Sequence, residues 1–117
     1  MSDIGIKIIK DEITGEELKK LAEETFIDMA KAVVDVEKEI MAIGGELHAD
    51  AEGLLIENGS EQKNLWGINI YINKPKEEQI QFISLINVRP SAGNSSMEIR
   101  DPAIKERIKK IVEKLIG

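Results

Sequence analysis

The clearest strand signals in this chain are Trp66-Gly67-Ile68-Asn69-Ile70-Tyr71-Ile72 and, further along, Ile80-Gln81-Phe82-Ile83-Ser84-Leu85-Ile86-Asn87-Val88-Arg89. Both stretches are rich in β-branched and aromatic residues, a composition typical of strands. Lys74-Pro75-Lys76 between them predicts a loop, because proline presets the backbone for a turn. The two stretches therefore predict an antiparallel hairpin, drawn here with Ile72 opposite Ile80.

The N-terminal half predicts a strand, a helix and a second hairpin. Isoleucines at positions 4, 6 and 8 alternate as on a strand. Thr14 and Glu17 have the spacing of a capping box, which predicts a helix over residues 15–28. Apolar residues from Ala32 to Ile43 then surround the polar turn Glu37-Lys38-Glu39, as expected for a hairpin.

Residues 47–58 fit two patterns, because their apolar residues follow a helix face while their acidic residues alternate as on a strand. Asn58-Gly59 is a good helix end, so we favour a short helix near 48–58. Asp101-Pro102 predicts the start of a final helix with an isoleucine stripe, after a loop through 90–96 and a short strand at 97–99.

These elements predict an α+β fold over residues 1–117, as a single domain. Its antiparallel sheet has about four to six strands, a usual size, and is packed by the N-terminal and C-terminal helices. At 117 residues, with 42% apolar and 32% charged side chains, the chain is long enough to bury a hydrophobic core.

Composition also narrows the classes of function. The chain has no cysteine, no apolar run long enough for a membrane span and no signal-peptide pattern. We therefore expect a cytoplasmic protein that does not bind a membrane. The net charge is −6 and aromatic residues make up only 3%, which argues against a nucleic-acid partner. The partner that we expect is another protein or a second copy in a homodimer.

The single histidine stands in Gly44-Gly45-Glu46-Leu47-His48-Ala49-Asp50-Ala51-Glu52. On a helix His48 and Glu52 lie one turn apart, a spacing that suits a base oriented by an acid or a divalent metal held by His48, Asp50 and Glu52. Asp35 lies inside an apolar stretch and could orient the same imidazole. The structural alternative is a surface histidine, and an aspartate exposed on an edge strand.

Polar side chains inside the second pair of strands suggest an anion site. Arg89 offers a planar fork for a carboxylate or phosphate, with Asn69, Asn87 and Asn94 nearby in the predicted fold. The alternative is that Arg89 pairs with an acidic residue and the asparagines satisfy loop backbone. Gly93-Asn94-Ser95-Ser96 matches no known phosphate-binding fingerprint.

Residues 44–52, Leu65-Trp66-Gly67-Ile68-Asn69-Ile70-Tyr71 and Ser84-Leu85-Ile86-Asn87-Val88-Arg89-Pro90 resemble a family of small prokaryotic proteins, catalogued only as a domain of unknown function. Gly93-Asn94 and Asp101-Pro102 are also similar, so the resemblance covers nearly the whole chain. It implies no activity, substrate or cofactor.

The sequence therefore leaves three functions open, of which a toxin–antitoxin-type or RNA-processing protein is the least favoured because the chain is acidic and poor in aromatic residues. The first is a non-catalytic binding or interaction module, either as a monomer or as a homodimer. The second is a small hydrolase, with His48 as general base or metal ligand and Asp35 or Glu52 orienting it. Arg89 and Asn87 would hold an anionic substrate in that enzyme. A divalent metal is the one cofactor that the pattern suggests.

Overall fold

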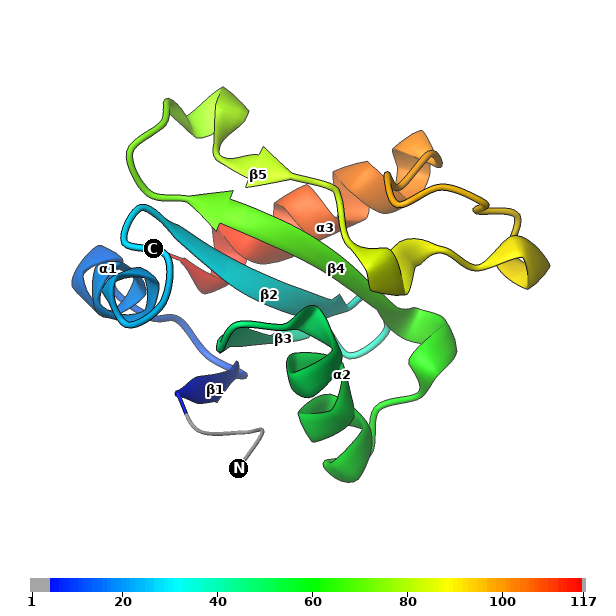
Figure 1. The fold of residues 1–117 in the computed structure, drawn as a ribbon, viewed down its shortest axis with the longest axis horizontal. Coiled ribbons are helices and arrows are strands. Elements are labelled where there is room, and N and C mark those ends of the chain that lie inside the picture. The colour runs from blue at the N-terminus through cyan, green and yellow to red at the C-terminus, as the bar shows by residue number, and fades with distance from the viewer. Residues whose placement is uncertain (1–4, 117) are drawn as a thin grey trace.

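A computed structural model describes residues 5–116 and contains one five-stranded antiparallel sheet in the order β1-β3-β2-β4-β5, which confirms the α+β prediction (Figure 1). The strands are β1 (Ile6–Ile9), β2 (Met29–Asp35), β3 (Ile40–Gly44), β4 (Leu65–Tyr71) and β5 (Ile80–Gln81). The α-helices are α1 (Gly15–Glu23), α2 (His48–Glu57) and α3 (Pro102–Leu115). Single 3-10 turns are η1 (Gln62–Asn64), η2 (Lys76–Glu78), η3 (Leu85–Asn87) and η4 (Pro90–Ala92).

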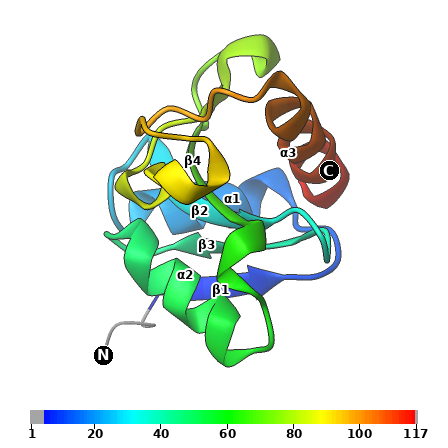
Figure 2. The same ribbon diagram turned by 90° about the vertical axis from the view of Figure 1, so that its right-hand side faces the viewer.

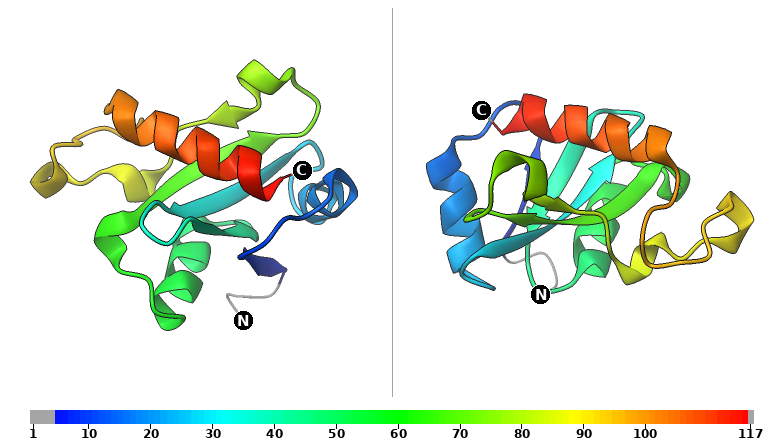
Figure 3. Two further views of the ribbon diagram at one scale, coloured as in Figure 1. Left: turned by 180° about the vertical axis from the view of Figure 1, so that it is seen from behind. Right: turned by 90° about the horizontal axis from the view of Figure 1, so that it is seen from above.

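The helices cover both faces of the sheet. Helices α1 and α3 lie on one face and α2 on the other, as the turned views show (Figures 2 and 3). Neighbouring residues of β2 therefore enter different cores: Val34 belongs to the main core with α1 and α3, whereas Val33 packs with Leu55 of α2. No helix in the span 5–116 is both long and apolar enough to cross a membrane.

Local signals place the helix ends. The capping box of Thr14 and Glu17 is present at the start of α1, and the Asp101 carboxylate caps α3 by accepting from the Ala103 N–H. Helix α2 lies close to its predicted bounds. Helix α1 stops at Glu23 rather than at residue 28, because the Ala22 carbonyl accepts the backbone N–H of Ile27, whose φ is +72°.

The hairpin predicted around the turn Glu37-Lys38-Glu39 is present as β2 and β3, and Asp35 is built into its turn. One Asp35 oxygen accepts from the backbone N–H groups of Glu37 and Lys38, each at 2.9 Å, and the other accepts from the Ser60 hydroxyl at 2.7 Å. Strand β2 is central, so the prediction of Asp35 on an edge strand is wrong. The carboxylate can be buried because backbone N–H groups of the turn and the Ser60 hydroxyl donate hydrogen bonds to it.

The prediction of a strand over 80–89 is wrong beyond Gln81. Ser84 begins the turn η3, and the chain no longer pairs with β4 through its backbone. The Asn87 side chain takes over the hydrogen bonds to β4 instead. Its amide accepts from the Gly67 N–H at 2.8 Å and donates to the Gly67 carbonyl at 3.0 Å. A Cβ on Gly67 would lie 2.6 Å from the Ser84 Cβ, so only glycine permits this close approach.

The register assumed for the hairpin of residues 66–89 is also wrong, by two residues. Ile80 pairs with Ile70 rather than with Ile72, and Asn69 pairs with Gln81. The strand expected at 97–99 is reduced to an isolated bridge between Ile83 and Glu98. In the first strand Ile6 and Ile8 pair with β3, whereas Ile4 lies outside the described residues.

Candidate functional site

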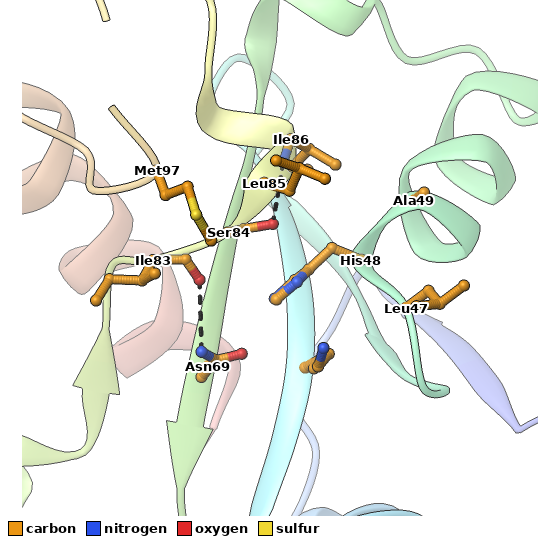
Figure 4. Close-up of a pocket in the computed structure, with 10 residues that line it drawn as sticks. Leu47, His48, Ala49, Asn69, Ile83, Ser84, Leu85, Ile86 and Met97 are labelled. Atoms are coloured by element: carbon orange, nitrogen blue, oxygen red, sulfur yellow. Dashed lines mark hydrogen bonds between the residues drawn. The ribbon is translucent and has the colours of Figure 1, made fainter. Parts of the chain in front are cut away.

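A groove of about 430 Å³ lies on the α2 face of the sheet, between the start of α2 and the segment Ile83–Ile86. The His48 ring extends from α2 toward the space between Ser84 and Asn69 (Figure 4). The lining residues come from β2, the start of α2, β4 and the chain around η3: Lys31, Leu47, His48, Ala49, Asn69, Ile83, Ser84, Leu85, Ile86 and Met97. We call Lys31, His48, Asn69 and Ser84 the polar floor, and Leu47, Leu85 and Met97 the apolar rim.

The apolar rim is exposed to solvent. Leu85 is 74% exposed, Leu47 57% and Met97 46%. The described residues include six large exposed hydrophobic side chains, and three of the six form this rim. Single exposed apolar residues are ordinary, whereas a group of them around a concavity is typical of a binding surface.

Lys31 and Asn69 form the centre of the polar floor. They are direct cross-strand partners in β2 and β4, so their side chains project from the same face of the sheet. The Asn69 amide donates to Gln81 Oε1 at 2.8 Å and to the Ile83 carbonyl at 3.4 Å. Asn69 is only 8% exposed, and its Oδ1 has no hydrogen-bond donor among the described residues.

His48 is buried and lines the groove. Its Nε2 lies 2.7 Å from the Ile68 carbonyl, which can only accept, so Nε2 carries the proton and Nδ1 is left as an acceptor. Desolvation by burial lowers the His48 pKa below its ordinary 6.5, and the positive charge of Lys31 lowers it further. The Ile68 carbonyl and the neighbouring Asn69 side chain oppose this shift of the pKa.

The N-terminus of α2 opens on the same groove without a side-chain cap. Leu47 occupies the N-cap position and has no side-chain oxygen to offer, although the first N–H groups of any helix lack partners within it. The turn before it depends on Gly44, where a Cβ would lie 2.2 Å from the Gly5 carbonyl oxygen. The start of α2, with the positive end of its dipole, therefore borders the groove, which Leu47, His48 and Ala49 line.

Arg89 and Glu52 meet outside the groove. Their charged groups are 4.0 Å apart and both side chains are largely buried. Arg89 Nη2 also donates to the Leu65 carbonyl, and the guanidinium lies 4.6 Å from the centre of the Trp66 ring. Burial lowers the Arg89 pKa, and the charge of Glu52 opposes that. The pair fastens α2 to β4 and to the chain before η4.

The other residues predicted for a site contact the backbone. Asn87 bridges Gly67 and the Met97 carbonyl, and Asn94 donates to the carbonyls of Asn87, Ser96 and Glu98. Of the four residues predicted to bind an anion, only Asn69 lines the groove.

The structure does not bring the catalytic and metal candidates together. Within the described part of the chain, no hydrogen bond joins His48 to Asp35 or Glu52. Among residues 5–116, no group of three or more histidine, aspartate or glutamate side chains is found that could hold a metal ion, whether around His48 or elsewhere.

Sequence reasoning missed Lys31, Ser84 and Met97 as residues of the site. Lys31 carried a usable signal, because a lysine between Ala30 and Ala32 breaks the apolar pattern of a buried strand. Ser84 and Met97 carried none, since the turn at η3 that brings them to the groove is a tertiary feature.

Comparison with known proteins adds one relationship. No match to the chain was found among curated proteins or among solved structures. The sequence profile of the family described as "Protein of unknown function (DUF5674)" matches residues 7–115. This confirms the resemblance to a domain of unknown function, and the chain belongs to the DUF5674 family.

Proposed function

We propose that this domain is a non-catalytic binding module and that its ligand occupies the groove beside α2. The observation that carries this proposal is the apolar rim around a concavity with a polar floor. Ligand sites are commonly concave and mostly apolar, with a few polar groups that fix orientation. A ligand with an apolar part would remove Leu85, Leu47 and Met97 from water and so gain hydrophobic free energy.

The contacts of the polar floor favour binding over hydrolysis. His48 and Ser84 line one groove, which is the observation that best supports the hydrolase alternative. However, no hydrogen bond joins them within the span 5–116: Ser84 Oγ accepts from the Ile86 N–H, and His48 Nε2 donates to a backbone carbonyl. A serine nucleophile needs a base in hydrogen-bond reach and a group that orients this base.

The test is a titration with 4-methylpentan-1-ol, a neutral probe with a branched apolar chain. The protein is labelled at its methionine methyl groups, and the imidazole signals of the single histidine are followed in the same spectra. We expect the Met97 and His48 signals to shift with a common saturation curve. The Met41 methyl in the main core serves as internal control and should stay unchanged.

Two matched variants localise the binding. Leu85→Ser should raise the Kd for the probe several-fold, whereas Ile27→Ser should leave it unchanged, because Ile27 is equally exposed at 72% but does not line the groove. Equal effects of the two variants, or no shift of the Met97 and His48 signals, would contradict the proposal.

A homodimer is the competing way to cover the apolar rim. Sedimentation velocity separates the two: a dimer that Leu85→Ser dissociates would make the groove an interface between copies. A monomer that binds the probe supports the binding module.

A further inference from the structure

We infer that the groove recognises an apolar α-amino-acid unit with a free carboxylate, supplied as a free amino acid or as the C-terminal residue of a peptide. This inference rests on the proposed function and names the chemistry of its ligand. Three parts of the groove carry it: a cationic end, an unsatisfied buried acceptor and an apolar wall.

The cationic end consists of the Lys31 ammonium and the uncapped start of α2. Among the described residues Lys31 has no carboxylate within ion-pair distance; its ammonium lies 5.3 Å from the centre of the Phe26 ring. Lys31 lines the same groove as His48, so its positive charge is available to a ligand there. A carboxylate placed between them would accept from the ammonium and from free N–H groups at the helix start.

The unsatisfied acceptor is Asn69 Oδ1. Buried polar atoms are normally paired, and this one lacks a donor although Asn69 uses its Nδ2 for two bonds. Asn69 is the cross-strand neighbour of Lys31, so the acceptor and the cation lie side by side on the floor. A ligand that satisfies both needs an N–H donor close to its carboxylate, which is the arrangement at the α-carbon of an amino acid.

The apolar wall selects the side chain of the ligand. Ile83, Leu85, Ile86 and Met97 line the part of the groove formed around η3. Methionine is flexible and adapts to irregular shapes, so this wall can pack against a branched aliphatic side chain such as that of leucine. A ligand side chain in this position would leave its carboxylate free to reach Lys31.

The first experiment compares N-acetyl-L-leucine with N-acetyl-L-leucinamide, in which a neutral carboxamide replaces the carboxylate, and with (S)-2-acetoxy-4-methylpentanoate, in which an ester oxygen replaces the N–H group. The shifts of the Met97 methyl and His48 signals give the Kd of each compound. We expect N-acetyl-L-leucine to bind at least about tenfold more tightly than either, since each comparison removes one polar contact to a desolvated group. Titrations with L-leucine and Gly-Gly-L-leucine then show which source binds more tightly, and a preference for either one supports the inference.

The variant Lys31→Met keeps the aliphatic stem and removes the charge. It should weaken N-acetyl-L-leucine about tenfold and leave 4-methylpentan-1-ol unaffected. Lys110→Met, on the exposed side of α3, is the matched control and should change neither Kd. Equal binding of the acid and its amide, or no effect of Lys31→Met, would overturn the inference while the neutral alcohol still binds. If 4-methylpentan-1-ol itself does not bind, that result contradicts the proposed function, and the inference that rests on it is overturned as well.

Discussion

Replacing Asn87 with aspartate tests whether one side-chain amide holds the wall of the groove to the sheet. Asn87 is fully buried and replaces a strand as the neighbour of Gly67. Aspartate has nearly the same shape and can still accept from the Gly67 N–H. It cannot donate, so the carbonyls of Gly67 and Met97, now 3.0 and 3.1 Å from Nδ2, would each face a carboxylate oxygen.

The expected loss of stability follows from these two bonds. A buried polar group left without its partner costs about 1–3 kcal/mol, so we expect Asn87→Asp to lower the free energy of unfolding by at least about 3 kcal/mol. With a urea m-value of about 1.5 kcal/mol/M, this lowers the unfolding midpoint by about 2 M. Equilibrium unfolding followed by the fluorescence of the single tryptophan, Trp66, measures the midpoint.

The loss should also depend on pH. Burial without a cation raises the pKa of the introduced carboxyl in the folded state above its unfolded value of about 3.9. The penalty is therefore complete at neutral pH, and it shrinks as the pH falls through the folded-state pKa toward the unfolded one. The difference between wild type and variant should be smaller at pH 5 than at pH 7.5.

Asn58→Asp is the matched control. Asn58 also donates to a backbone carbonyl, that of Leu54 at 2.8 Å, but from an exposed position at the end of α2. The same substitution there should cost less than about 1 kcal/mol, because water replaces the lost bond. If Asn87→Asp costs no more than Asn58→Asp, the Asn87 amide does not hold the segment after β5 to Gly67.

Three further outcomes can be measured by the same unfolding assay. Ile27→Asn should stabilise the protein by about 1 kcal/mol, because Ile27 is exposed and has a φ of +72°, which asparagine tolerates better; an unchanged midpoint would refute strain at this site. Gly67→Ala should destabilise it by about 1–3 kcal/mol, since the added Cβ would lie 2.6 Å from the Ser84 Cβ, and full stability would mean that η3 moves freely. The pKa of His48 is lowered in the folded state, so the unfolded state binds a proton first, and stability should fall as the pH drops from 7.5 through 6.5 toward the folded-state pKa. His48→Gln should remove this part of the pH dependence, and an identical profile in the variant would assign it to other groups.

The sequence by itself determined the elements that local chemistry specifies. The capping box at Thr14 and the Asp101-Pro102 start of α3 need only residues within one helical turn, and both are present. The hairpin turn after Asp35 is equally local, because a side chain accepts from backbone N–H groups two and three residues ahead. The α+β class follows from these signals and from the alternation of apolar residues.

Only the tertiary structure decided what Arg89, Asn87 and Lys31 do. The apolar run over 80–89 has strand composition, yet it leaves the sheet after Gln81 because Asn87 pairs with a glycine 20 residues earlier. The groove exists because β2, α2, β4 and the segment around η3 converge, which no local pattern encodes. Side-chain spacing fixes which residues share a face of one element, whereas a site made from several elements depends on long-range register and on one close approach at Gly67.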